Sequence, residues 1–170
     1  MTKSSIFFLF TTLIISLTQC TSVQSNQNFI SQTCKQTPYY KLCVNFLKSD
    51  PRSVNADTTK LALIMVDVIK ARTTMSLNFI HQQIGKNPGL KKQLKSCAGA
   101  YSVVLSDVIP SAIEALTKGA PKFAQTDTND AANEATGCEE DFHGKSPMTQ
   151  LNNMVHHSSL IASAIIQLLL

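Results

Sequence analysis

Residues 94–119, LKSCAGAYSVVLSDVIPSAIEALTKG, carry a strong helical pattern. Apolar residues recur in this stretch every three or four positions, a spacing that places side chains on one face of an α-helix. The pattern therefore predicts a long amphipathic helix. Pro110 lies inside the pattern and has no backbone N–H, so we expect a kink there and a carbonyl near Ser106 without its normal partner. The repeating residues are Leu90, Leu94, Cys97, Tyr101, Val104, Val108, Ala112 and Leu116.

Two other segments show the same helical period. They run through Leu61, Ile64, Met65, Val68, Met75, Phe79 and Ile80, and through Met148, Leu151, Val155, Leu160, Ile161, Ile165 and Leu168. Residues 124–137, AQTDTNDAANEATG, contain only alanine as an apolar residue and could be read as a loop. Helical spacing nevertheless continues across them, through Phe123, Ala131, Ala135, Cys138 and Phe142. Strands are not expected, because no alternation of period two persists.

Helix boundaries are marked by a capping residue followed by proline. The cap oxygen can accept from an unpaired backbone N–H, and proline at the first helical position lacks a donor that would be unpaired anyway. Glycines predict helix ends, and short turns near residues 85–88, 119–121 and 144–147 make neighbouring helices antiparallel. We predict an all-α fold, an up-down-up-down four-helix bundle with an N-terminal helical hairpin. The predicted caps are Thr37, Asp50, Asp57, Asn87 and Ser146, and the predicted helix ends are Gly85, Gly119 and Gly144.

The N-terminus has the pattern of a secretory signal peptide. Lys3 precedes an apolar run over residues 6–17, which is too short to cross a bilayer. Cleavage after Cys20 or Ser25 would leave a small residue at the last position, and we take Asn26 as the working start. We predict a signal peptide over residues 1–25 and one secreted domain over residues 26–170, without a membrane segment. The hairpin and linker would occupy residues 26–56 and the bundle residues 57–170.

Four cysteines follow the leader: Cys34, Cys43, Cys97 and Cys138. An even number in a short secreted chain is typical of disulfides, so two bridges are expected. The gaps of eight, 53 and 40 residues contain no C-x-x-C pair, which argues against zinc. Three pairings are open. Pairing the first two cysteines would close the hairpin, and a bridge between the last two would hold the alanine-only segment against the long helix.

Nucleic-acid binding is not expected from the charge pattern. Without Lys3 the chain has 14 basic and 11 acidic residues, a net charge of +3 with neutral histidines. Its lysines are dispersed apart from Lys91, Lys92 and Lys95, and it contains no tryptophan. A nucleic-acid interface would instead need a clustered basic face with aromatic platforms.

Catalytic, cofactor and metal sites are also not expected. The chain lacks a G-x-S-x-G elbow and a phosphate-binding glycine loop, and two bridges would leave no free cysteine. Adjacent helical residues point about 100° apart, so His156 and His157 do not converge on one site. The same holds for the carboxylates of residues 139–141, which we interpret as a solvated face. We predict that the protein is not an enzyme.

The remaining candidate is the turn that contains Pro121, Lys122 and Phe123. A structural interpretation has Phe123 packed inward and Lys122 on an ordinary surface. A functional interpretation makes the turn a protruding plug, which a stiff proline would let dock with little loss of entropy. Lysine could then meet a pair of carboxylates, and phenylalanine could cover a sugar-sized pocket.

Several segments together resemble the plant invertase and pectin methylesterase inhibitor family. They are CKQTPYYKLCVNFLKSDPRS at 34–53, TTKLALIMVDVIKA at 58–71, the stretch at 94–119 and PKF at 121–123. The resemblance covers essentially the whole region after the leader. It implies a helical hairpin on a four-helix bundle, with disulfides Cys34–Cys43 and Cys97–Cys138.

The resemblance also implies an inhibitor without a cofactor. In the invertase inhibitors, PKF enters the cleft of acid invertase, a family 32 glycoside hydrolase that splits sucrose with two carboxylates. Carried over, Pro121 shapes the turn, Lys122 faces the acidic residues and Phe123 packs beside it, in a one-to-one complex that excludes sucrose. Ala120 departs from the acidic residue expected there in many relatives.

The other branch of the family is an alternative, because a shared fold does not settle the target. A pectin methylesterase inhibitor would bind its enzyme mainly through a bundle face. Either target implies a secreted protein of the apoplast and cell wall, or of the vacuole. Acidic compartments also make the histidines candidates for strengthening the complex on protonation. They are His81, His143, His156 and His157.

Overall fold

The computed structural model describes residues 28–170, and within that range the chain is helical without strands. The predicted signal peptide, residues 1–25, lies outside the described residues. Residues 28–34 form a first helical stretch. The later elements are α2 (Tyr40–Ser49), η1 (Pro51–Ser53), α3 (Thr58–Ile84), η2 (Pro88–Leu90), α4 (Lys91–Val103), η3 (Val104–Val108), α5 (Ile109–Thr117), α6 (Pro121–Glu140) and α7 (Thr149–Gln167).

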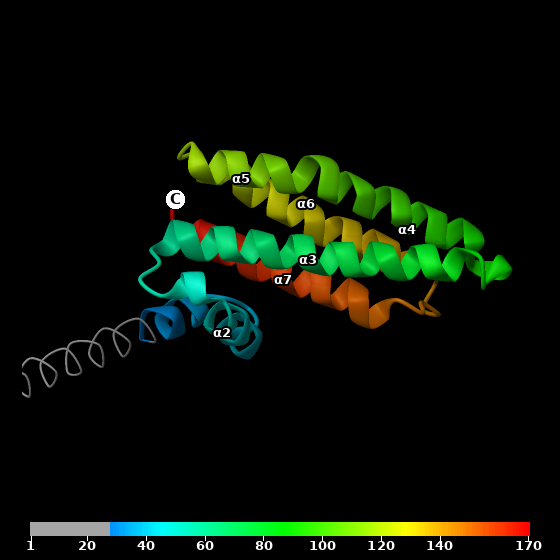
Figure 1. Cartoon of the computed structure of the whole chain (residues 1–170), viewed down its shortest axis with the longest axis horizontal. Coiled ribbons are helices and arrows are strands. Elements are labelled where there is room, and N and C mark those ends of the chain that lie inside the picture. The colour runs from blue at the N-terminus through cyan, green and yellow to red at the C-terminus, as the bar shows by residue number, and fades with distance from the viewer. Residues whose placement is uncertain (1–27) are drawn as a thin grey trace, which may run out of the picture.

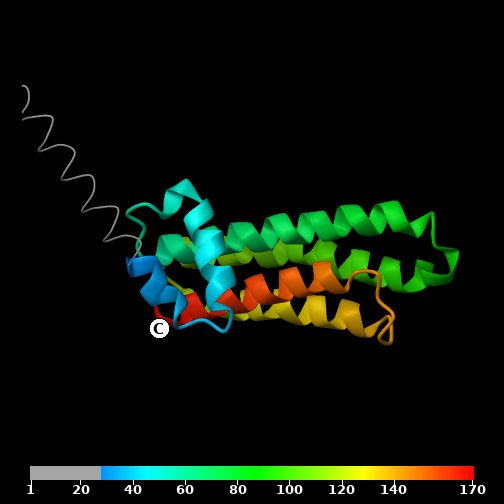
Figure 2. The same ribbon diagram turned by 90° about the horizontal axis from the view of Figure 1, so that it is seen from below.

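Four long elements form an up-down-up-down bundle, namely α3, the continuous α4–η3–α5, α6 and α7 (Figure 1). Helix α3 packs against α4 and α7, and α6 packs against α5 and α7. The N-terminal hairpin, residues 28–49, lies beside the bundle at the end where the C-terminus is found (Figure 2). We call this the hairpin end and the opposite one the distal end. The predicted fold class is confirmed.

The buried side chains form two clusters. The larger one lies toward the hairpin end and joins the hairpin to the bundle, with Cys34, Leu47, Leu61 and Ile165 all fully buried. The smaller one lies toward the distal end and contains Tyr101. Because the hairpin shares the larger core, burial of apolar surface holds it on the bundle.

Along the three long apolar stripes of α3, α4–α5 and α7, the pattern predicted most buried positions and was wrong at two. Met75 is 50% exposed and Leu168 is 46% exposed. The buried stripe of α3 passes instead through the small hydroxyl residues Thr73 and Ser76, both fully buried. Met75 points about 100° away from its neighbour Ser76, so a search for apolar residues alone selected the wrong face. Leu168 lies just beyond the end of α7.

Two of the five predicted caps are confirmed. Asp50 accepts from the backbone N–H two residues on (2.8 Å), and Asp57 from the one three residues on (2.7 Å). The predicted N-caps at Thr37 and Asn87 were wrong. Their side chains instead donate to the preceding helical segment and close its end. Ser146 accepts from a backbone N–H two residues on (3.0 Å), but α7 begins only at Thr149.

The helix that contains Pro110 is interrupted by a π turn. In η3 the Ile109 N–H donates to the Val104 carbonyl, five residues back, and the helix then continues as α5. The predicted interruption of the helix at Pro110 therefore takes the form of a wider, π-type turn. The helical stretch Pro88–Thr117 is long and apolar enough to cross a membrane by those two criteria alone, but it packs its apolar stripe into the bundle.

Both disulfides pair as the resemblance implied. Cys34–Cys43 closes the hairpin with a Cα–Cα distance of 5.6 Å, and Cys97–Cys138 joins α4 to α6 with one of 5.0 Å. Residues 124–137, which could have been a loop, lie wholly within helix α6. The second bridge crosslinks this helix, which has few large apolar residues, to the long helix beside it.

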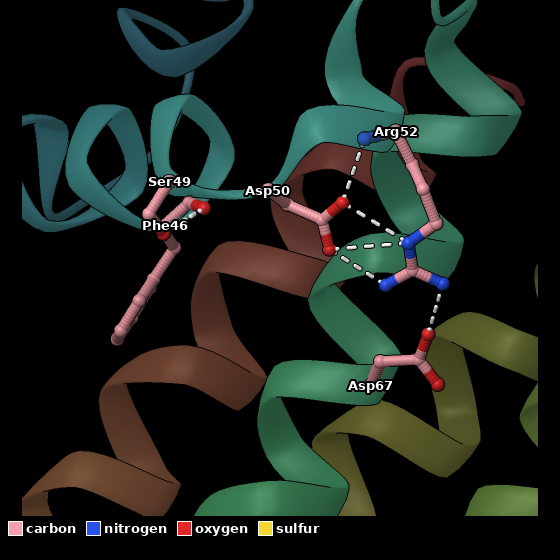
Figure 3. Close-up of polar contacts among 5 residues, drawn as sticks. All are labelled: Phe46, Ser49, Asp50, Arg52 and Asp67. Carbon is pink, nitrogen blue, oxygen red and sulfur yellow. Dashed lines mark hydrogen bonds and ion pairs between the residues drawn. The ribbon is translucent and has the colours of Figure 1, made fainter.

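Arg52 connects the linker after the hairpin to helix α3 (Figure 3). Its guanidinium pairs with Asp50 at 2.6 Å and with Asp67 of α3 at 2.7 Å. The hydrogen bond from Arg52 is the main cause that lowers the pKa of Asp50. Exposed ion pairs contribute at most about 1 kcal/mol, so this network mainly orients the linker.

Candidate functional site

The α5–α6 turn, residues 118–123, has a rigid backbone. The Gly119 N–H donates to the Leu116 carbonyl (3.4 Å) and the Ala120 N–H to the Ala115 carbonyl (2.8 Å), which are the two bonds of a Schellman motif. Gly119 has φ of +73°, a conformation that glycine adopts without a steric penalty. Ala120 also packs against the larger core. The turn is therefore held in place before any partner arrives.

Phe123 projects from this turn into solvent. Its side chain is 71% exposed, whereas the next residue, Ala124, is fully buried. Pro121 opens α6, and the register of that helix directs Ala124 to the core and Phe123 away from it. Of the two interpretations of the turn, the structural one, in which Phe123 packs inward, is wrong. Lys122, between them, is exposed as well.

The start of α6 is electropositive. Its N-cap, Ala120, has no side chain that can accept a hydrogen bond, and the first turn contains no acidic residue. The first N–H groups of a helix carry partial positive charge, which here belongs to a helix of 20 residues. Lys122 adds a full charge and forms no salt bridge within residues 28–170, whereas Lys118 pairs with Glu114. The turn thus suits a negatively charged partner.

The four histidines do not join this turn. His81 lies in the last turn of α3 and His143 follows α6, both toward the distal end. His156 and His157 lie within α7, and the ring of His157 packs against that of Tyr39 with centroids 4.0 Å apart. Burial, and secondarily the charge of His156, lower the pKa of His157.

The predicted solvated carboxylate face is wrong for Glu139. Its carboxylate accepts a hydrogen bond from the Asn152 Nδ2 (2.7 Å) and another from Thr149, and Asn152 Oδ1 accepts one from the Tyr101 hydroxyl (2.7 Å). Burial is the main cause that raises the pKa of Tyr101. Single-residue patterns could not find this network, because its members come from three helices. Its internal hydrogen bonds indicate a structural role.

The described residues 28–170 contain no cluster of three or more His, Cys, Asp or Glu side chains that could hold a metal ion. A pocket of about 380 Å³ lies between the linker and α3. Its lining residues, Arg52, Lys60, Leu63 and Ile64, include no nucleophile beside a base. By contrast, the α5–α6 turn presents an exposed aromatic side chain next to an exposed lysine.

Comparison with known proteins identifies relatives along most of the chain. Residues 28–165 match the family model described as plant invertase/pectin methylesterase inhibitor. The chain is 43% identical over 141 residues to cell wall / vacuolar inhibitor of fructosidase 1 of Arabidopsis thaliana, covering 83% of this chain and 69% of that protein. Inhibitor of fructosidase 2 of the same plant is 44% identical over 107 residues, which cover 61% of this chain and 59% of that protein.

Inhibitors of pectin methylesterase are also similar to this chain. A pectinesterase inhibitor of Actinidia deliciosa is 30% identical over 147 residues, covering 84% of this chain and 79% of that protein. The crystal structure of mutant form A of a pectin methylesterase inhibitor from Arabidopsis has a TM-score of 0.70, covering 81% of this chain and 95% of that chain. At 24% identity this match supports the fold alone. The chain belongs to the plant invertase/pectin methylesterase inhibitor family.

Proposed function

We propose that this protein inhibits plant acid invertase, a β-fructofuranosidase of the cell wall or vacuole, by inserting the α5–α6 turn into the active-site cleft. The observation that carries the proposal is the environment of the turn, with an exposed Phe123 and a Lys122 that forms no salt bridge within residues 28–170, both on an ordered backbone. The two relatives that are 43% and 44% identical are named inhibitors of fructosidase, which supports this target.

The chemistry of the cleft complements the turn. Glycoside hydrolases of this kind use two carboxylates, which an incoming Lys122 would neutralise together with the positive start of α6. One such charge pair at about 4 Å has a Coulomb energy of about 4 kcal/mol at an effective dielectric constant of about 20, before desolvation. Phe123 would cover the apolar surface that a sugar ring contacts. Sucrose is then excluded sterically in a one-to-one complex.

The rigid backbone contributes to affinity in a different way. A flexible loop loses conformational entropy when it binds, and a preorganised loop loses much less. The Schellman motif at Gly119 and the ring of Pro121 restrict the turn in the free protein. Inhibition requires neither a cofactor nor catalysis by the inhibitor itself. The names of the relatives and the predicted signal peptide together favour secretion to the cell wall and apoplast, or delivery to the vacuole.

Inhibition of pectin methylesterase through a bundle face is the second candidate. The Actinidia deliciosa pectinesterase inhibitor, which matches 84% of this chain, favours it. Its lower identity of 30%, and the projecting PKF turn, place it second.

Replacing Pro121, Lys122 and Phe123 with alanine distinguishes the two candidate functions. Purified acid invertase and pectin methylesterase are each titrated at pH 5 with the wild-type protein and this triple variant, and sucrose hydrolysis or methyl-ester release is recorded. We expect the wild type to inhibit invertase and the variant to lose about 100-fold or more in affinity, as for loss of a central binding residue. Circular dichroism should show the fold unchanged.

Lys118→Ala is the matched control. This lysine lies at the same turn, but its charge is already paired with Glu114. Its removal should change inhibition little. Unchanged inhibition by the triple variant would overturn the plug mechanism, and inhibition of the esterase alone would favour the second candidate.

A further inference from the structure

Two leucines lie exposed at the same end of the bundle as the α5–α6 turn. Leu168 is 46% exposed and Leu170 is 59% exposed, and the C-terminus marked in Figure 1 lies at this end of the bundle. Single exposed apolar residues are ordinary on protein surfaces, so these two leucines are informative only through their position next to α6. We call Leu168 and Leu170 the leucine pair.

The fold holds the end of α7, which leads into the leucine pair, against the first turns of α6. Gln125, four residues after Pro121, donates from its amide to the Gln167 side chain across the α6–α7 contact (2.6 Å). Leu169, between the two leucines, packs against the larger core. The backbone N–H groups of residues 168–170 each donate to a carbonyl three residues back, at 2.9–3.3 Å. The leucine pair is therefore presented by an ordered turn.

Charge near the leucine pair indicates the kind of partner. Lys122, three residues before Gln125, and the start of α6 contribute positive charge next to the end of α7. A second copy of the chain docked through the same surface would bring two such positive ends together, which is unfavourable. A partner with carboxylates next to an apolar wall matches both parts of the surface. An acidic cleft with an apolar rim has that arrangement.

We propose that the leucine pair is a second part of the target-binding surface and docks on an apolar wall beside the acidic cleft that receives Lys122. This inference rests on the proposed function and extends the contact from α6 to the end of α7. Burial of the two leucines adds affinity of its own. It also keeps water from the Lys122–carboxylate pair, which strengthens that attraction.

The test compares four forms of the full chain against acid invertase at pH 5. They are the wild type, the double variant Leu168→Ser and Leu170→Ser, the PKF triple alanine variant, and a control. The control carries Met75→Ser and Val103→Ser, two side chains of similar exposure, 50% and 49%, on α3 and α4. We expect the leucine double variant to raise the inhibition constant about tenfold, a factor suited to the loss of two partly buried apolar side chains. The control should match the wild type.

The outcomes distinguish the two proposals. If the leucine variant inhibits like the wild type while the PKF variant fails, this inference is overturned and the proposed function stands. If the PKF variant inhibits like the wild type, the plug fails independently of the leucines. An equal loss in the control variant would contradict a specific role for the leucine pair. Self-association of the wild type in sedimentation, abolished in the leucine variant, would assign the pair to dimerisation and also overturn the inference.

Discussion

Helix α6 has a phenylalanine near each end, and the two side chains lie in opposite environments. Phe123, in its first turn, is 71% exposed, whereas Phe142, just past its last residue, is 4% exposed. The same residue type thus packs in the core at the distal end and projects from the hairpin end. Phe142 removes apolar area from water within the protein, and Phe123 leaves its area available to a partner.

The surroundings of the two residues extend this contrast. At the distal end, the Cys97–Cys138 disulfide lies beside the hydrogen-bonded network of Tyr101, Asn152 and Glu139. At the hairpin end, α6 starts without a side-chain cap, and an unpaired Lys122 lies beside it. One helix can therefore be secured at its distal end while its first turn remains available to another molecule.

The largest expected effect is loss of the distal disulfide. Replacing Cys97 and Cys138 with alanine opens a loop with a sequence separation of 41, which the chain-entropy model values at about 4 kcal/mol. The same change at Cys34 and Cys43, with a separation of 9, should cost about 2.7 kcal/mol. Urea unfolding of the two variants measures the difference. Equal losses would contradict a special dependence of the distal end on its crosslink.

The second prediction tests the two phenylalanines directly. Phe142→Ala should lower the free energy of unfolding by about 3 kcal/mol, because it leaves a cavity in the distal core. Phe123→Ala should change it by less than about 0.5 kcal/mol, as expected for an exposed side chain. Inhibition of invertase by the folded variants should show the reverse order. A large loss of stability in Phe123→Ala would mean that its side chain packs in solution.

The third prediction concerns the polar network. Tyr101→Phe removes the hydroxyl that donates to Asn152 and leaves a buried acceptor with one partner fewer. The expected loss is about 1–2 kcal/mol, measured by thermal or urea unfolding. Ser102→Ala changes an exposed hydroxyl on the same helix and is the matched control, with an expected change below about 0.5 kcal/mol. A neutral Tyr101→Phe variant would show that the network contributes no net stability.

The smallest effect should come from His157. Its pKa is lowered in the folded protein, so below the unfolded value of about 6.5 the unfolded chain binds the proton more readily. Stability should therefore decrease slightly as pH falls through about 6.5. His157→Gln should flatten this dependence in melting temperatures measured between pH 7.5 and 5. The control variant is His81→Gln, which replaces an exposed histidine at the distal end of α3.

The candidate site could be predicted in part from the sequence. Gly119 and Pro121 placed a tight turn between two helices, and the resemblance directed attention to PKF. The orientation of Phe123 could not be predicted, because both interpretations use the same turn residues. The deciding fact is the register of α6, in which the neighbouring Ala124 is fully buried. The sequence also does not distinguish Lys122 from Lys118. The folded structure does, because there Lys118 pairs with Glu114.

The leucine pair shows a similar limit. Leu168 was placed on an apolar stripe by its spacing, yet it lies beyond the last residue of α7 and is half exposed. Spacing describes one helix at a time and does not show where that helix stops being covered by its neighbours. The hydrogen bond between Gln125 and Gln167, 42 residues apart, depends on the packing of α6 against α7.

The residue pattern alone predicts the all-helical class, the order of the long helices, the number of disulfides and the positions of the turns. These follow from local physics, since helical period, proline, glycine and cysteine act through their own neighbourhood in the chain. Only the tertiary structure decided which ends are covered, which hydroxyls replace apolar residues in the core, and how Pro110 is accommodated by a π turn. Those outcomes depend on contacts between helices, and in particular on which surface remains uncovered when four helices pack together.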